Sequence, residues 1–381
     1  MARRVLIAFV DALGSEQLER FGGALSFVPH RRALTGVLGY SSGALATVLT
    51  GAHASEHGRM CLFAQRREGD DGLLKPLKWL GLLPRVLHER GAFRRKVAQA
   101  LASARGLTGY VALHRVPPKD FEWLDLPERE DLFAAKDIGG VPTFLSQARE
   151  AGLSVYASPW QLPEAERWRH VHETLARSQP ELTFLYAAEM DGVLHAEGND
   201  GQAAQAVRGR IAGELDRARE ALLRGGHEVL TIVVGDHGMA EVSRTIDPRE
   251  LTSKLDARVF VDSTMLRFWG THAQLGRARL LAERAKLPGR WLDTSALRER
   301  NAAIEGAPYG SALFVLDEGV IFAPSFVGGR ARGMHGYDLD ARSARAAIAS
   351  DAPLPEDLRA LTDLAPLVSR ALGLAARGAA A

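Results

Sequence analysis

The chain has 381 residues, of which 46% are hydrophobic and 25% charged, a balance typical of a folded globular protein that excludes disorder over most of its length. Its 48 Lys and Arg nearly cancel its 46 Asp and Glu, and the net charge of +2 is too small to attract a nucleic-acid polymer by charge alone. A single cysteine, Cys61, excludes an intrachain disulfide and a thiolate metal site.

The first apolar run covers residues 5–10 and is ended by Asp11. Because a signal peptide needs about 7 to 15 apolar residues, we interpret this run as a strand. The sequence contains no run of about 18 apolar residues, so we expect no transmembrane helix. Since one cysteine requires no oxidising compartment, we expect a soluble protein of the cytoplasm.

Short apolar runs alternate with helical patterns along much of the chain. The runs are mostly apolar throughout, as in parallel strands buried on both faces, and cover residues 5–10, 153–157, 182–186 and 229–234. The helical patterns cover residues 42–50, 141–151, 202–224, 273–285 and 356–371. This alternation predicts an α/β fold, with a doubly wound, mostly parallel central sheet and helices on both faces.

Two segments interrupt the alternation, in line with a length that allows about two domains of roughly 150 residues. Residues 59–137 are rich in Arg, aromatic residues and Pro, whereas the later segment includes strand-like runs at 259–262 and 312–316. We predict an inserted cap over 59–137, a second cap or subdomain over 257–327, and an α/β core formed by residues 1–58, 138–256 and 328–372. Residues 373–381 have little to bury, which predicts a disordered tail.

Acidic residues and histidines follow the predicted strands. Because the carboxyl ends of strands in an open α/β sheet line one crevice, residues that are distant in sequence converge there. These residues are Asp11, Asp191, His195, Asp236 and His237, together with His335 in a Gly-flanked loop. Each has an ordinary alternative: a helix N-cap for Asp11, a helical side-chain pair for Asp191 and His195, a turn for Asp236 and His237, and a structural histidine for His335.

Taken together, three Asp and three His have the composition of a site for two ions, Zn²⁺ or Mn²⁺. Such ions lie about 3.5 to 4 Å apart, where one activates the nucleophile and the other stabilises the leaving oxygen of an in-line displacement. The composition therefore favours phosphoryl transfer or phosphoester hydrolysis.

A nucleophile is expected where a helix starts near this crevice. Ser41 and Ser42 open the helical pattern that Gly51 closes, and either is also a candidate N-cap. Both roles are compatible, because one serine can cap while the other attacks. The N–H groups of Ser42 and Gly43, and the Tyr40 side chain before them, are the expected contacts of the substrate phosphate.

The motifs that carry these residues span positions 5–338. They are Val10-Asp11, Ser41 nine residues before Thr50-Gly51, Ala54-Ser55-Glu56-His57-Gly58, Asp191-Gly-Val-Leu-His195, Gly235-Asp236-His237-Gly238-Met239 and Gly333-Met-His335-Gly336-Tyr337-Asp338. The set resembles the alkaline phosphatase superfamily, and within it the type I phosphodiesterase/nucleotide pyrophosphatase branch. All six metal-ligand positions of that family are filled, in the family's order.

The resemblance implies two metal sites and a covalent mechanism. One ion would be held by Asp191, His195 and His335, and the other by Asp11, Asp236, His237 and the Ser41 alkoxide. Ser41 occupies the position of the family's Thr or Ser nucleophile. The implied reaction is two in-line displacements, in which Ser41 forms a phosphoserine that metal-activated water then hydrolyses.

The chain departs from the family pattern around its nucleophile. Ser42-Gly43-Ala44-Leu45 stands where the family has Phe-Pro-Asn-His, and Leu62 stands where it has a phosphoryl-binding Asn. Contact with the phosphoryl oxygens then falls to the N–H groups of Ser42 and Gly43 or to a cap residue. The sulfatase branch is excluded, because neither serine is followed by x-Pro-x-Arg.

The implied function is a two-metal phosphodiesterase or pyrophosphatase, with Zn²⁺ as the default ion and Mn²⁺ compatible with the same ligands. A phosphomonoesterase or a phosphotransferase would use the same residues. A non-catalytic metal-binding relative would have lost ligands or the nucleophile, and none is missing here. We expect a small-molecule phosphoester linked to a nucleotide, sugar or lipid as substrate, and neither a nucleic-acid partner nor stable membrane insertion.

Overall fold

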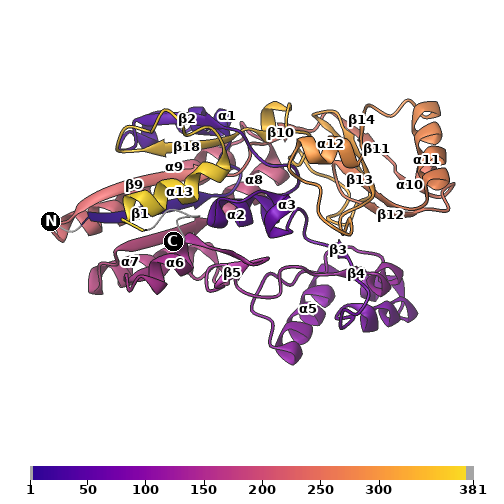
Figure 1. Cartoon of the computed structure of the whole chain (residues 1–381), viewed down its shortest axis with the longest axis horizontal. Helices are drawn as coiled ribbons and strands as arrows, with labels where there is room; N and C mark the ends of the chain where they lie inside the picture. Colours follow the sequence, from indigo (N-terminus) through magenta and orange to yellow (C-terminus); the bar gives the residue numbers. More distant parts are fainter. Residues whose placement is uncertain (1–2, 375–381) are drawn as a thin grey trace, which may run out of the picture.

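The computed structural model describes residues 3–374 and is built on a six-stranded sheet in the order β2-β18-β9-β1-β8-β7 (Figure 1). The strands are β1 (Arg3–Val10), β2 (His30–Leu34), β7 (Val155–Ala157), β8 (Leu182–Ala187), β9 (Glu228–Gly235) and β18 (Ala346–Ser350). Strands β9, β1, β8 and β7 are parallel to one another, whereas β18 runs antiparallel to both of its neighbours. The predicted α/β fold with a mostly parallel sheet is confirmed.

Helices cover both faces of the sheet because its central strand β1 is apolar on both sides. Alternate residues of β1 point to opposite faces, and residues 5–10 are all buried. One set packs with α2 (Ser41–Thr50), α6 (Phe144–Glu150) and α13 (Leu364–Ala371). The other packs with α1 (Ser15–Arg20), α7 (Glu164–Arg177), α8 (Glu189–Glu197) and α9 (Gln202–Arg224). At roughly 1.5–3 kcal/mol for each large apolar side chain removed from water, these two layers hold the sheet rigid.

The C-terminal helix begins at Leu364 and not at residue 356 as predicted. Residues 361–363 form a short 3₁₀ helix, and the residues just before them lie beside Thr35, whose N–H donates to Arg359 O and whose carbonyl accepts from Leu361 N. This pairing is with a residue more than 300 positions away, so the helical pattern of 356–363 loses to a long-range contact.

The helix predicted over 141–151 is also shorter. Val141 and Pro142 form β6, which pairs with β5 (Asp137–Ile138). Helix α6 follows because the Thr143 side chain accepts a hydrogen bond from Ser146 N and so caps the helix. The other predicted helices and strands lie within two residues of their expected bounds.

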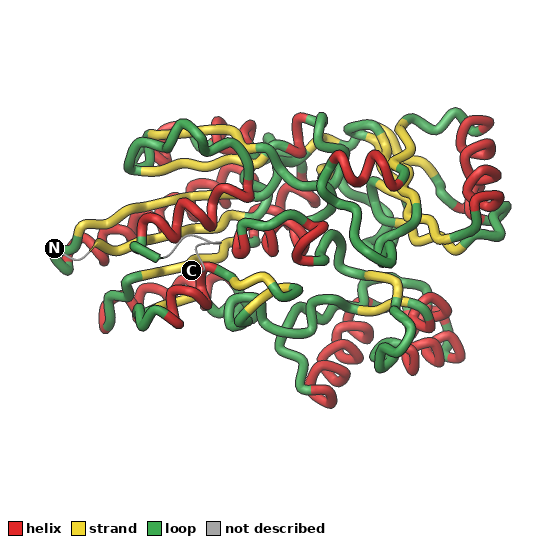
Figure 2. The backbone as a smooth tube through the Cα atoms, in the orientation of Figure 1, coloured by secondary structure: helices red, strands yellow, loops and turns green. Residues whose placement is uncertain are grey.

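Segments 59–137 and 257–327 differ in structure but pack on each other. The first contains β3 (Ala64–Gln65), α4 (Arg85–His88), α5 (Gly91–Arg105), β4 (Leu124–Asp125) and two 3₁₀ helices. The second contains an antiparallel sheet of β12 (Arg258–Val261), β13 (Met265–Trp269), β15 (Ala312–Leu316) and β14 (Gly289–Leu292). It also contains the helices α11 (His272–Arg284) and α12 (Thr294–Glu299). Its strand β16 (Val320–Phe322) pairs with β11 (Arg244–Ile246). Phe63 of the first segment and Phe260, Trp269 and Phe326 of the second share one buried cluster. Both segments lie beyond the same end of the central sheet (Figure 2).

Among residues 3–374, no helix is both long and apolar enough to cross a bilayer. The predicted disordered tail lies mostly outside the described residues, which end at Leu374. The described part follows the end of α13, where Leu374 N donates to Ser369 O.

A fully buried arginine of segment 257–327 contacts segment 59–137. Arg267 on β13 donates from Nε to Asp262 Oδ2 at 2.5 Å and from Nη1 to the carbonyl of Phe63 at 2.8 Å. Its guanidinium also lies 4.6 Å from the centroid of the Phe260 ring. The ion pair with Asp262 holds the Arg267 side chain in place, and its hydrogen bond to Phe63 links the two segments.

We expect Arg267→Met to lower the free energy of unfolding by about 3–5 kcal/mol, because it leaves Asp262 buried and uncompensated. The double variant Arg267→Met, Asp262→Asn should recover part of that loss. Arg279→Met is the matched control, since Arg279 and Asp293 form an exposed pair at 4.0 Å whose loss costs about 1 kcal/mol or less. Denaturant unfolding measures all three, and equal costs for Arg267→Met and Arg279→Met would contradict the assignment.

Candidate metal centre

The six predicted ligands lie together at the carboxyl edge of the central sheet. Asp11 directly follows β1, and Asp236 and His237 follow β9, which pairs with β1. Asp191 and His195 lie one helical turn apart on α8, which follows β8. His335 follows β17 (Gly333–Met334), a short strand that pairs with β10 (Ala240–Glu241) just beyond β9.

One group of donor atoms forms around His237. Its Nε2 lies 3.6 Å from Asp11 Oδ1 and 3.3 Å from Asp236 Oδ2. Its Nδ1 lies 2.8 Å from the carbonyl of Gly238, a contact that places the ring proton on Nδ1 and leaves the Nε2 lone pair for a metal. Donor atoms of all three side chains lie within 4.8 Å of one another, so they can share one ion.

A second group forms around Asp191. Donor atoms of Asp191, His335 and again His237 lie within 4.8 Å of one another, and the His237 and His335 rings stack with centroids 3.5 Å apart. His195 lies beside this group, with Nε2 3.3 Å from Asp191 Oδ1 and Nδ1 2.8 Å from the carbonyl of Gly333. The structure therefore places His195 and His335 beside the same oxygen, Asp191 Oδ1, but the tighter group contains His237 in place of His195.

Burial and repulsion oppose the ionisation of the two carboxyls around His237. Burial raises the pKa of Asp11 well above its ordinary value, and the neighbouring Asp236 and Asp191 raise it further. Burial and the charge of Asp191 likewise raise the pKa of Asp236 to about 7. A positive charge at this position would relieve both effects.

The balance is reversed around Asp191, where imidazoles supply positive charge. Burial by itself would raise the pKa of Asp191, but the charges of His195 and His335 hold it below its usual range. Burial opposes protonation of His195 too, yet Asp191 raises the pKa of this histidine to about 9. In the protein alone, the His195 proton thus neutralises Asp191, and metal binding would release that proton.

The residues present fit divalent cations. Within residues 3–374, three buried polar atoms of the centre are without a well-formed hydrogen bond: Asp191 Oδ1 and Asp236 Oδ2, each of which has only an imidazole Nε2 at 3.3 Å, and His335 Nδ1. Such atoms cost roughly 1–3 kcal/mol each, and three in one cluster point to a ligand that satisfies them together. Carboxylate oxygens and imidazole nitrogens in this number are the donors that Zn²⁺ and Mn²⁺ accept.

Ser41 lies at the first position of α2 and points into the centre. Its Oγ lies 2.9 Å from His237 Nε2 and 3.3 Å from Asp11 Oδ1. The N-cap residue of α2 is Tyr40 and makes no side-chain capping bond, so neither Ser41 nor Ser42 has the N-cap role. Both serines are free of that structural task. Of the two N–H groups expected to contact a phosphate, that of Gly43 already donates to the Tyr40 carbonyl at 2.8 Å, whereas that of Ser42 lies in the first turn, where a helix leaves N–H groups unpaired.

Tyr40 is engaged by segment 257–327. Its hydroxyl donates to Thr264 Oγ1 at 2.8 Å, and the Thr264 hydroxyl in turn donates to the carbonyl of Gly336 at 2.6 Å. The Tyr40 ring also meets the His335 ring edge-on, with centroids 5.6 Å apart. Tyr40 therefore ties the nucleophile turn to the His335 loop, a role that the sequence did not indicate.

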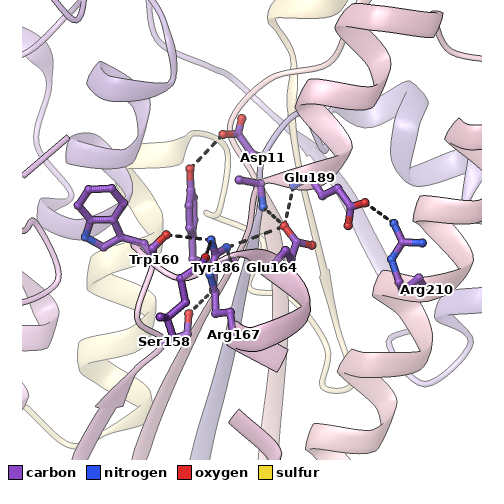
Figure 3. Close-up of polar contacts among 10 residues, drawn as sticks. Asp11, Ser158, Trp160, Glu164, Arg167, Tyr186, Glu189 and Arg210 are labelled. Atoms are coloured by element: carbon purple, nitrogen blue, oxygen red, sulfur yellow. Dashed lines mark hydrogen bonds and ion pairs between the residues drawn. The ribbon is translucent and has the colours of Figure 1, made fainter. Parts of the chain in front are cut away.

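Tyr186 is a residue that sequence reasoning missed. Its hydroxyl donates to Asp11 Oδ2 at 3.3 Å and so leaves Oδ1 for Ser41 and His237 (Figure 3). Arg167 Nη1 donates a hydrogen bond to the backbone carbonyl of Tyr186 at 2.7 Å. Asp11 is not a helix N-cap, because α1 starts after Gly14. The sequence signal that could have found Tyr186 is its position, because it is the aromatic residue with a hydroxyl group in the apolar run 182–186.

Glu164 fixes the start of the helix that carries Asp191. Its Oε2 accepts hydrogen bonds from Ala188 N at 2.9 Å and from Glu189 N at 2.7 Å (Figure 3). A carboxylate at this position satisfies N–H groups of the first turn of α8 and complements the helix dipole. Asp191, in the same turn, is thereby held at a fixed distance from β8.

Residues 82–306, more than half of the chain, match the family model of type I phosphodiesterase/nucleotide pyrophosphatase. The chain belongs to this family. It is therefore a phosphoric ester hydrolase of the alkaline phosphatase superfamily, as its motifs predicted. The matched range contains Asp191, His195, Asp236 and His237, and the fold adds Asp11, Ser41 and His335 from outside it.

Solved structures of ectonucleotide pyrophosphatase/phosphodiesterase 5 share the fold over nearly the whole chain. The human protein is 16% identical, with a TM-score of 0.68, and the murine protein is 16% identical, with a TM-score of 0.69; each comparison covers 98% of this chain and 96% of the other. A further murine structure is an inactive variant in complex with AMP. No curated protein sequence matches the chain. At this level of identity, the likeness establishes the fold.

We expect Asp236→Asn to lower the Zn²⁺ affinity by at least about 100-fold, because it removes a charged donor from the group around His237. The matched control is His57→Gln. His57 is buried nearby, but its Nε2 lies 3.0 Å from Thr47 Oγ1 and its Nδ1 accepts from Arg59 N, so no lone pair is left for a metal. Zn²⁺ titration of metal-free protein measures both, and an equal loss of affinity in His57→Gln would argue against the site.

Proposed function

We propose that the chain is a two-metal phosphodiesterase or pyrophosphatase that acts through a covalent phosphoserine at Ser41. The observation that carries the proposal is the position of Ser41 Oγ, 2.9 Å from His237 Nε2 and 3.3 Å from Asp11 Oδ1, inside a cluster of three carboxylates and three imidazoles. A serine in that position has no structural task and lies where a phosphoryl group would meet both donor groups.

The ions that would be held are Zn²⁺ or Mn²⁺, one by Asp11, Asp236, His237 and Ser41, and the other by Asp191, His195 and His335. When bound, they supply Lewis acidity for the attacking and the leaving oxygen. His237 lies in both groups of donor atoms, and its place between them makes it the residue through which the two positions are coupled.

In the first step, Ser41 Oγ gives up its proton and forms a bond to phosphorus, while the bond from phosphorus to the leaving alcohol or phosphate oxygen breaks and that oxygen leaves with the electron pair and takes up a proton. Asp11 and His237 orient Oγ for this attack. In the second step, a water oxygen forms a bond to phosphorus, the Oγ–P bond breaks, and a proton from the water returns to Ser41 Oγ. The N–H of Ser42 at the start of α2 stabilises the phosphoryl oxygens in both steps, since the N–H of Gly43 already donates to the Tyr40 carbonyl.

A phosphomonoesterase or a phosphotransferase remains the alternative, because the same residues would serve and only the second acceptor would differ. The family description favours the diester. A non-catalytic metal-binding role is the remote alternative. It is opposed by the intact nucleophile and ligand set.

The proposed substrate is a small phosphoester, with a nucleotide-linked ester first because a murine relative of the same fold was solved with AMP. Sugar-linked and lipid-linked esters are the next candidates.

We propose that segments 59–137 and 257–327 act as cap and subdomain over the core of residues 1–58, 138–256 and 328–372 and select the leaving group. Since the lone Cys61 is buried and needs no oxidising compartment, we propose a cytoplasmic location.

The test is hydrolysis of bis(p-nitrophenyl) phosphate by metal-reconstituted protein beside Ser41→Ala, with metal content determined on the same samples. We expect a loss of at least about 10³-fold in kcat/KM for Ser41→Ala while both ions stay bound, because the attacking oxygen is gone. p-Nitrophenyl phosphate at the same concentration separates the diesterase from the monoesterase. A Ser41→Ala variant that keeps wild-type turnover would contradict the phosphoserine mechanism.

A further inference from the structure

The turn that carries Ser41 is packed against the start of segment 59–137. Tyr40 N donates to the carbonyl of Met60 at 3.0 Å. A Cβ added to Gly43 would lie 2.9 Å from Met60 Cα and 3.2 Å from the carbonyl of Arg59, so a larger residue would force the two backbones apart. Gly43 therefore brings the Arg59 backbone directly against the first turn of α2.

Arg59 is fixed from both sides. Its N–H donates to His57 Nδ1 at 3.1 Å, and the carbonyl lies against Gly43 as described. Its side chain lines a narrow pocket together with Ser42, Glu128 and four less polar residues, among them Leu62. The pocket thus borders the residue next to the nucleophile.

Two donors in this pocket have nothing to bind. Arg59 Nη1 and Ser42 Oγ are both buried, and neither has a hydrogen-bond partner within residues 3–374. A buried guanidinium N–H without an acceptor is unfavourable by roughly 1–3 kcal/mol or more, so a native site of this kind calls for an anionic acceptor. Leu62, at the position of the family's phosphoryl-binding Asn, offers no polar atom in the same pocket.

We propose that Arg59 Nη1 and Ser42 Oγ bind a non-bridging oxygen of the phosphoryl group that Ser41 receives. The inference rests on the proposed role of Ser41. A guanidinium carries a full charge where an amide would carry none, and its hydrogen bond to a phosphoryl oxygen is correspondingly stronger. Arg59 thereby supplies the contact that Leu62 cannot make.

The charges around the pocket are compatible with a bound phosphate. Burial raises the pKa of Glu128 to about 7, although Arg59 and the Tyr110 N–H oppose this shift, while Asp131 adds to it. The Glu128 carboxyl is therefore partly neutral near pH 7 and repels an anion less than an ordinary glutamate.

The experiment measures binding of inorganic phosphate to metal-loaded Ser41→Ala protein by calorimetry, so that no turnover interferes. We expect Arg59→Met in this background to weaken phosphate binding roughly 10- to 100-fold, in line with the loss of one charge-assisted hydrogen bond. Arg59→Lys should recover part of the loss, and Ser42→Ala should show a smaller loss. Arg67→Met, which removes an exposed arginine of the same segment, is the control and should bind like its parent.

Metal content and the melting temperature of each variant are determined alongside, so that a folding defect is recognised, and Ser42→Ala tests the pocket without changing charge. Unchanged phosphate affinity in both Arg59→Met and Ser42→Ala, with metals bound, would overturn the proposal. The outcome is separable from the proposed function. If wild-type protein hydrolyses no ester but Arg59→Met weakens phosphate binding, the role of Arg59 is supported and the proposed reaction is contradicted. If hydrolysis depends on Ser41 but neither hydrolysis nor phosphate binding depends on Arg59, the reaction is supported and the role of Arg59 is contradicted.

Discussion

The site depends on three carboxylates that a parallel sheet forces together. β9, β1 and β8 are neighbours, so Asp236, Asp11 and Asp191 emerge at the same edge and are separated by little more than the spacing of strands. Burial raises the pKa values of Asp11 and Asp236, and the repulsion between the carboxylates raises them further. Imidazoles, the Tyr186 hydroxyl and the N–H of Ala12, which donates to Asp236 Oδ1 at 3.2 Å, offset part of that repulsion.

The sequence predicts the sheet and the convergence of its ligands because both follow from local patterns. A fully apolar run such as residues 5–10 is typical of a buried parallel strand, and the residue after such a run lies at the ligand-binding edge by topology alone. The same logic located the start of α2, since a Gly-closed helix opened by Ser41 and Ser42 is visible without any long-range contact.

What the sequence does not disclose depends on long-range packing. The late start of α13 follows from its pairing with Thr35, and the position of His237 between two donor groups follows from side-chain stacking with His335. Arg59 is similar: in the sequence it is one of 48 basic residues, and its place beside Ser42 becomes visible only through the contact of Gly43 with Met60. No periodicity encodes such pairs.

The aromatic cluster shared by segments 59–137 and 257–327 also bears on how the chain is made. During synthesis, Phe63 leaves the ribosome about 200 residues before Phe260 and Trp269 and about 260 residues before Phe326, with which it is finally buried. A nascent chain can pair β1 with β8 and β9 before that point, but it must carry an incomplete apolar surface until residue 326 is out. His335 emerges later still, and β18 of the central sheet follows it, so the candidate metal centre and the sheet that carries it are both completed late in synthesis.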